Sequence, residues 1–121
     1  MGKKILIAED ESNILVSLEF LMERSGYEIR TVADGEEALR VTREFRPDLL
    51  LLDIMLPLRN GFEVCQLIRE APDLRSMKIV MLTAKGRDTE VTKGLALGAD
   101  AYITKPFATQ ELLDTVKRLL E

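Results

Sequence analysis

Residues 49–53 read Leu49-Leu50-Leu51-Leu52-Asp53, and this stretch decides the fold of the chain. Four consecutive apolar residues are typical of a strand that is buried on both faces of a parallel sheet. The carboxylate of Asp53 ends the run, so a charge lies where the buried strand reaches the edge of its sheet. This pattern predicts an α/β protein with a polar site at one edge of the sheet.

Three further short apolar runs also end in polar side chains. Because the carboxyl ends of parallel strands lie at one edge of a sheet, we expect these side chains to converge there. Together they supply acids, hydroxyls and an amine. The runs are residues 5–8, followed by Glu9 and Asp10; residues 79–82, followed by Thr83; and residues 101–103, followed by Thr104 and Lys105.

Strand-like runs alternate with helix-like periods along the whole chain, which predicts parallel βα units. The second and fifth strands are the least apolar, so we expect them at the edges of the sheet. This favours a five-stranded sheet of order 2-1-3-4-5 with helices on both faces, and a ligand site between the first and third strands. The expected strands are residues 4–7, 28–32, 48–53, 78–83 and 101–104.

Five helices are expected between and after these strands. Asp34 is typical of a helix cap, with Glu37 in the third helical position. Val91 and Leu95 mark the apolar face of the fourth helix. The other apolar faces comprise Ile14, Leu18 and Leu21; Ala38, Val41, Thr42 and Phe45; Val64, Cys65 and Ile68; and Leu112, Val116 and Leu119.

Composition narrows the class of protein. A chain of 121 residues fits one domain over residues 1–121. The net charge of −4 disfavours direct contact with nucleic acid or a membrane surface, and no apolar run is long enough to span a bilayer. The lone Cys65 fits a reducing, cytoplasmic compartment. The chain has no histidine, which excludes histidine metal ligands, general bases and phosphohistidine carriers within it.

The three acids Glu9, Asp10 and Asp53 would repel one another unless a cation lies among them. Their all-oxygen ligand set selects a hard ion, and the small number of protein ligands favours Mg²⁺. Lys105 and Thr83 are suited to phosphoryl oxygens. Taken singly, each side chain has an ordinary structural explanation, as a turn residue, a strand-end hydroxyl or a surface lysine. Their convergence favours a functional site.

These residues and their surroundings resemble the receiver domains of two-component response regulators, the CheY-like family with a flavodoxin-like fold. The matching segments extend along the whole chain: ILIAEDE, LLLLDIMLP, NGFEV, VMLTA and GADAYITKPF. Thr83 and Lys105 follow Asp53 at the spacings of the family's hydroxyl and lysine. Glu9 departs from the family, in which aspartate is more common.

The resemblance implies that Asp53 is the phosphoacceptor and attacks a phosphohistidine of a sensor histidine kinase or phosphotransfer protein. Asp10, Asp53 and the backbone carbonyl of Met55 would bind Mg²⁺, while Glu9 would hold a metal-bound water. The protein would therefore be a signalling switch that assists its own phosphorylation and dephosphorylation, rather than a metabolic enzyme.

The resemblance also implies a phosphoryl-binding set and a switch. Thr83, Ala84 and Lys105 would bind the phosphoryl group. Movement of Thr83 would let Tyr102 turn inward and reshape the face made by the fourth helix, fifth strand and fifth helix. Lys105-Pro106 would be a cis peptide bond.

The family also implies partners. A homodimer would form through the same face, with Lys93 facing Glu111 and Asp100 facing Arg118. An output domain of the same protein or a separate target would receive the signal.

Two other functions on related folds fit less well. A phosphohydrolase with an aspartate nucleophile carries a second acid two residues after it, where this chain has Met55. A nucleotide- or flavin-binding module needs a glycine-rich first loop, where this chain has residues 9–12 of sequence EDES. In receiver domains, the residues at the positions of Met55 and Lys85 influence the attacking water. Met55 cannot orient a water by hydrogen bonding and Lys85 could cover the phosphoryl group, so the resemblance implies a phosphorylated state that lasts longer than in fast chemotaxis receivers.

Overall fold

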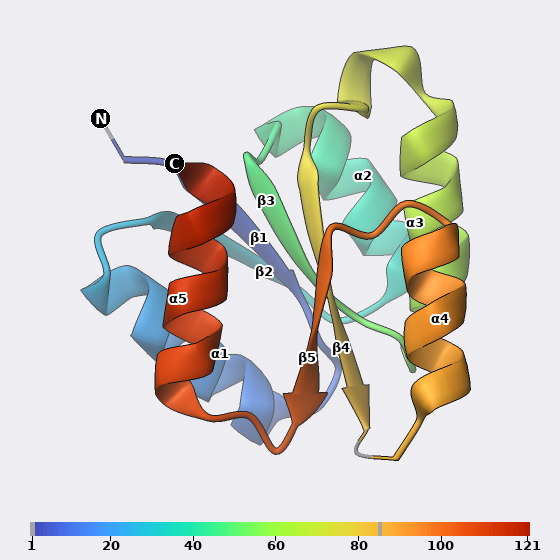
Figure 1. Ribbon diagram of the computed structural model, residues 1–121. Coiled ribbons are helices and arrows are strands. Elements are labelled where there is room, and N and C mark those ends of the chain that lie inside the picture. Colours follow the sequence, from blue (N-terminus) through green and yellow to red (C-terminus); the bar gives the residue numbers. More distant parts are fainter. Residues whose placement is uncertain (1, 85) are drawn as a thin grey trace.

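The computed structural model describes residues 2–84 and 86–121, and within them five parallel strands form one sheet in the order β2-β1-β3-β4-β5 (Figure 1). The predicted fold class and strand order are therefore confirmed. In this order β1 and β3 are neighbours, with Ala8 opposite Leu52. The strands are β1 Lys4–Ala8, β2 Glu28–Val32, β3 Leu49–Asp53, β4 Lys78–Ala84 and β5 Ala101–Lys105.

Helices cover both faces of the sheet, with α1 and α5 on one face and α2, α3 and α4 on the other (Figure 1). Among the described residues, no helix combines the length and the apolar character needed to cross a membrane. The helices are α1 Ser12–Arg24, α2 Gly35–Phe45, α3 Gly61–Glu70, α4 Asp88–Ala96 and α5 Thr109–Leu120, with a 3₁₀ turn at Pro72–Leu74.

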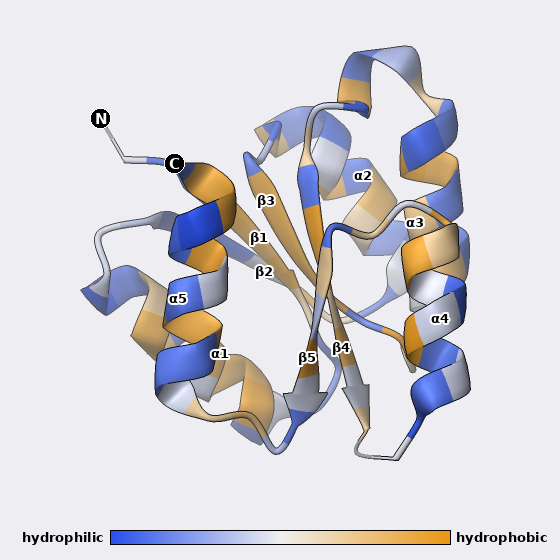
Figure 2. Ribbon diagram, viewed as in Figure 1, coloured by the Kyte–Doolittle hydropathy of each residue, from blue (hydrophilic) through white to orange (hydrophobic). Residues whose placement is uncertain are grey.

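The apolar residues of the strands pack into two hydrophobic cores, one on each face of the sheet (Figure 2). Successive side chains of a strand point to opposite faces, so Leu50 and Leu52 join one core while Leu49 and Leu51 join the other. All four leucines are fully buried. Each buried leucine contributes about 1.5–3 kcal/mol, so burial anchors β3 firmly in the sheet.

Local signals set the starts of α2 and α3. The side chain of Asp34 accepts the N–H of Glu37 at 2.7 Å, which confirms the predicted cap of α2. At the start of α3, Asn60 accepts the N–H of Glu63 and the Glu63 carboxylate accepts the N–H of Asn60. Such reciprocal bonds satisfy N–H groups that the first helical turn leaves free.

The predicted apolar face of α4 is only partly correct. Leu95 is 44% exposed, and the buried residue of this helix is Gly94. A Cβ at Gly94 would lie 3.4 Å from the side chain of Met81 on β4, so the helix approaches the sheet through a residue without a side chain. The spacing of apolar side chains along a helix does not reveal a contact made by a glycine, because glycine has no side chain.

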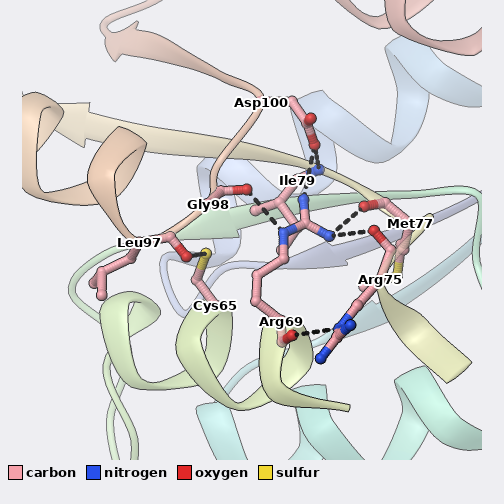
Figure 3. Close-up of polar contacts among 8 residues, drawn as sticks. All are labelled: Cys65, Arg69, Arg75, Met77, Ile79, Leu97, Gly98 and Asp100. Atoms are coloured by element: carbon pink, nitrogen blue, oxygen red, sulfur yellow. Dashed lines mark hydrogen bonds and ion pairs between the residues drawn. The ribbon is translucent and has the colours of Figure 1, made fainter. Parts of the chain in front are cut away.

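The guanidinium of Arg69 joins three segments at the rim where the strands begin (Figure 3). This side chain extends from α3, and its acceptors lie in the connection to β4 and in the turn between α4 and β5. Asp100 also accepts the N–H of Ile79, so the network reaches the start of β4. Arg69 donates to the carbonyls of Met77 (2.7 Å), Gly98 (2.8 Å) and Arg75 (3.1 Å) and to Asp100 Oδ2 (2.9 Å).

The two ends of the described chain lie together beside the turn between α1 and β2. A Cβ on Gly2 would lie 2.8 Å from the carbonyl oxygen of Gly26. Burial raises the pKa of the neighbouring Tyr27, and the charge of Glu121 raises it further. This turn belongs to the rim where the strands begin, opposite the carboxyl ends of the strands (Figure 1).

Candidate functional site

Three acids converge where β1 and β3 end, as the sequence predicts. Asp53 is the last residue of β3, and Glu9 directly follows β1, where its N–H still donates to Val32 of β2 at 3.1 Å. Carboxylate oxygens of Glu9, Asp10 and Asp53 all lie within 4.8 Å of one another. The strand order therefore brings residues 9 and 53 to one point at the edge of the sheet.

Lys105 completes this cluster from the end of β5. Its ammonium lies 3.0 Å from Glu9 Oε1 and 3.2 Å from Asp53 Oδ1. Glu9 is fully buried and Asp53 is 3% exposed, whereas Asp10 is exposed. A buried carboxylate without a partner is costly, so the amine is what makes the two buried acids tolerable here.

The surroundings of the cluster raise the pKa of two of its groups. Burial raises the pKa of Glu9 and the charge of Asp53 raises it further, while the N–H of Glu11 and the amine of Lys105 oppose this shift. For Lys105, burial alone would lower the pKa, but the hydrogen bond to Glu9 and the charges of Asp53 and Glu9 outweigh it and raise the pKa. The two carboxylates thus favour the charged form of Lys105, whereas the amine only partly offsets the effects of burial and of Asp53 on Glu9.

The donor set fits a hard divalent cation. One ammonium faces three carboxylates, which leaves excess negative charge at the site. All the available donors are oxygens, and the exposed Asp10 leaves room on the solvent side for the waters that Mg²⁺ retains. Met55 lies beside these acids, since its N–H donates to Asp53 Oδ1 at 3.4 Å, and its side chain is exposed.

Thr83 does not share a hydrogen bond with these acids. Its side chain is buried, and its hydroxyl donates to Glu90 Oε1 of α4 at 3.1 Å. Alternation along β4 places Thr83 on the face of Ile79 and Met81, toward α2, α3 and α4. The sequence predicts Thr83 at the same edge as the acids, and the structure confirms the edge but gives its hydroxyl another partner.

Glu90 is a polar partner that the sequence analysis missed. It lies in the first turn of α4, seven positions after Thr83 along the chain. The available signal was an acid near a helix N-terminus, where a carboxylate is favoured by the helix dipole alone. That general preference concealed its specific contact with the hydroxyl.

The other predicted site residues lie on the adjoining strands. Ala84 is the exposed last residue of β4, and Tyr102 on β5 is 45% exposed. The Lys105-Pro106 bond is cis, as the resemblance implies. Lys85, for which the sequence analysis predicts an influence on the attacking water, lies outside the described residues.

The side chains predicted to pair across a dimer have contacts within the chain. The Lys93 ammonium lies 4.5 Å from the centre of the Phe62 ring, and Asp100 binds Arg69. Beside them is a hollow of about 390 Å³ on the face made by α4, β5 and α5. Its lining comprises Leu95, Asp100, Ala101, Tyr102, Thr104, Glu111, Thr115 and Arg118.

Comparison with known proteins agrees with this geometry. The family model of the response regulator receiver domain matches residues 5–117. The alkaline phosphatase synthesis transcriptional regulatory protein PhoP of Bacillus subtilis is 46% identical over 120 residues, which cover 99% of this chain and 49% of that protein. The chain spans about half the length of the curated relatives it matches.

Solved structures resemble the chain over nearly its whole length. A putative response regulator from Chloroflexus aurantiacus superposes with a TM-score of 0.96 at 37% identity, covering 99% of this chain and 98% of that one. The receiver domain of the sensor histidine kinase PA1611 from Pseudomonas aeruginosa superposes with a TM-score of 0.91 at 31% identity, covering 99% and 98%. That structure has a magnesium ion coordinated in its active-site cleft.

Proposed function

The chain belongs to the family of response regulator receiver domains, and from this premise we propose that residues 1–121 form a single receiver domain with Asp53 as its phosphoacceptor. The observation that carries the proposal is the setting of this carboxylate. Asp53 is buried at the end of the central strand, in contact with Lys105 and beside two further acids. A nucleophile of this kind forms an acyl phosphate.

The phosphoryl donor is a phosphohistidine on a sensor histidine kinase or a phosphotransfer protein. A carboxylate oxygen of Asp53 attacks the phosphorus atom while the bond from phosphorus to the imidazole nitrogen breaks. The electron pair of that bond stays on the imidazole nitrogen, and the imidazole leaves as neutral histidine. Its proton is either on the ring before transfer or is taken up as the bond breaks. The ammonium of Lys105, 3.2 Å from Asp53, pairs with the phosphoryl oxygens during transfer.

Asp10, Asp53 and the carbonyl of Met55 would hold Mg²⁺, and Glu9 would hold one of its waters. When bound, this ion supplies positive charge against the oxygens of the phosphoryl group. The oxygen donors of this chain support the assignment, as does the magnesium ion in the related PA1611 receiver domain.

Thr83, Ala84 and Lys105 bind the phosphoryl group after transfer. The signal then reaches the face of α4, β5 and α5 through movement of Thr83 and Tyr102, so the protein assists its own modification as a switch and not as a metabolic enzyme. The face carries this signal to a second copy of the chain or to a target. The domain works in the cytoplasm, which the unpaired Cys65 fits, and it signals to an output domain or a separate target.

The test is labelling with acetyl phosphate and Mg²⁺, followed by measurement of the intact mass. We expect the parent chain to gain one phosphoryl group and the Asp53→Asn variant to gain none, because an amide is a poor nucleophile. Asp114→Asn, a change of an exposed aspartate on α5, is the matched control and should label like the parent. Full labelling of Asp53→Asn would refute the assignment, and continuous phosphate release without a stable label would indicate a phosphohydrolase.

A further inference from the structure

The hydroxyl of Thr83 has one close acceptor among the described residues, and it is the carboxylate of Glu90. The distance from Oγ1 to Oε1 is 3.1 Å, whereas the contact with the carbonyl of Ala84 is 3.5 Å. Thr83 ends a strand of the sheet and Glu90 lies in the first turn of α4. One side-chain hydrogen bond therefore connects the edge of the phosphoryl site to this helix.

The surroundings make this hydrogen bond effective. The Glu90 side chain is only 20% exposed and Thr83 is buried, so water competes weakly for either group. A bond to a charged acceptor is also stronger than one between neutral groups. Among the described residues, Glu90 forms one ion pair, with the exposed Arg87, whose Nη1 is 3.8 Å away, and an exposed pair at that distance contributes little.

Helix α4 has few other anchors near this bond. Its N-cap residue Arg87 makes no side-chain cap, and Gly94 is its buried residue. The carboxylate of Glu90 thus holds the first turn of the helix against the end of β4. Any event that breaks this bond frees the turn of the helix that lies nearest to the site.

The hydroxyl proton of Thr83 can make a short hydrogen bond to only one acceptor at a time. A threonine hydroxyl carries one hydrogen, so while Thr83 donates to Glu90 it cannot donate to a phosphoryl oxygen. Alternation along the strands also separates the two partners, because Thr83 faces the side of α4 while Asp53 and Lys105 share parity with the opposite core. Binding of a phosphoryl group by Thr83 requires that the bond to Glu90 first breaks.

We propose that Glu90 is a latch: a positioning residue that holds the Thr83 hydroxyl away from the phosphoryl site and thereby lowers the affinity of the domain for a phosphoryl group. The inference rests on the proposed function, which it deepens by naming the residue that restrains the switch. By linkage, phosphorylation must release the first turn of α4 to the same extent that Glu90 opposes phosphorylation. Glu90 contacts none of Glu9, Asp10, Asp53 or Lys105 in the described hydrogen bonds and ion pairs, so its effect on Mg²⁺ affinity is small.

The experiment is a titration with beryllium fluoride, an analogue of a carboxyl-bound phosphoryl group, at saturating Mg²⁺. Binding is followed by amide NMR signals, because the chain has no tryptophan. We expect Glu90→Ala to bind beryllium fluoride about tenfold more tightly than the parent, the change that loss of one hydrogen bond to a charged group produces. Glu90→Gln, which keeps a neutral acceptor, should shift the affinity in the same direction by less.

Two controls isolate the hydroxyl contact. In a Thr83→Val background, which removes the hydroxyl at nearly constant volume, Glu90→Ala should leave the affinity unchanged. Asp88→Ala removes another acid from the first turn of α4, where its side chain makes no described contact with Thr83, and should behave like the parent. Mg²⁺ affinity should stay within about twofold in every Glu90 variant.

The possible outcomes distinguish failure of the proposed phosphoacceptor function from failure of the Glu90 latch. If the parent neither binds beryllium fluoride nor labels at Asp53, the proposed function fails. If the parent binds but Glu90→Ala and Glu90→Gln bind no more tightly, the latch is refuted while the function stands. An equal gain in the Thr83→Val background would also refute it, because the effect would then not pass through the hydroxyl. Should Glu90→Ala unfold, Glu90→Gln alone decides the outcome.

Discussion

The buried Glu9 carboxylate governs how the site behaves without a metal ion. Burial raises its pKa above the ordinary 4.5, so the folded chain holds this proton more tightly than the unfolded chain. The stability that this group contributes is fully present below pH 4.5 and is lost as the pH rises through the higher folded pKa. Burial of this carboxyl therefore lowers the stability of the folded chain at any pH above its folded pKa.

We predict that Glu9→Gln raises the free energy of unfolding of the metal-free protein at pH 7 and flattens its decline between pH 5 and pH 7. Lys105 keeps Asp53 as a partner in this variant, so no buried amine is left alone. The measurement is urea denaturation in the presence of a chelator at both pH values. A variant that is less stable than the parent at pH 7 would contradict this account of the acids.

Lys105 opposes cation binding by its position between the acids. We predict that Lys105→Ala binds Mg²⁺ severalfold more tightly than the parent, because an ammonium 3.2 Å from Asp53 competes with a cation for the same carboxylate. The same variant should bind beryllium fluoride poorly, since it lacks the positive charge that pairs with phosphoryl oxygens. Both affinities can be measured by NMR titration, and a large loss of Mg²⁺ affinity would argue against this role.

Among the secondary-structure elements, the helices that precede and follow β4 in the sequence are anchored in different ways. Helix α3 buries Val64, Cys65 and Ile68 and carries the Arg69 network at its end (Figure 3). Helix α4 buries Gly94 alone and meets β4 through the bond between Glu90 and Thr83. Helix α3 is therefore held firmly against the sheet, whereas α4 can move with little loss of buried apolar area.

We predict that Arg69→Lys lowers the free energy of unfolding by about 1–3 kcal/mol, because an ammonium cannot reach all four acceptors and leaves buried carbonyls unpaired. Arg40→Lys is the matched control, since Arg40 makes only an exposed pair with Glu44 along α2. That change should stay within about 0.5 kcal/mol of the parent. Chemical denaturation measures both variants, and equal losses would show that the Arg69 contacts carry no special weight.

The elements differ in how far the sequence predicts them. The apolar runs at β1, β3 and β4 fix the strand order, because only central strands are buried on both faces, and the strand order brings Glu9 to Asp53. A contact made by a glycine, such as that of Gly94 with Met81, leaves no trace in the pattern of apolar residues along the sequence. The bonds of Arg69 to carbonyls also escape prediction, since every residue carries a carbonyl and the sequence does not say which ones are free.

The molecule as a whole presents one face, made by α4, β5 and α5, where the signal would leave the domain. We predict a monomer without a phosphoryl analogue and a dimer with beryllium fluoride and Mg²⁺, measured by sedimentation. Reversing one charge, as in Lys93→Glu or Glu111→Lys, should abolish the dimer, and combining the two reversals should restore it. Activation must draw Lys93 from the Phe62 ring for this pair to form.

If either single reversal leaves the dimer intact, the pair of Lys93 and Glu111 does not form across it. A dimer that appears equally without the analogue would instead separate assembly from phosphorylation. Either result would leave the assignment of Asp53 standing, because labelling tests that residue independently.

Gly2 lies against the turn at Gly26, and Glu121 is near enough to Tyr27 for its charge to raise the pKa of that residue, so both ends of the described chain are at one rim of the sheet. A short glycine linker between these ends would allow circular permutation, with new ends opened in a surface loop. A dye, a bead or a fused reporter attached near Gly2 or Glu121 would stand at the rim where the strands begin, opposite the carboxyl ends of the strands (Figure 1). The fold can thus be immobilised or inserted into another protein while the acidic cluster at the opposite rim stays unobstructed.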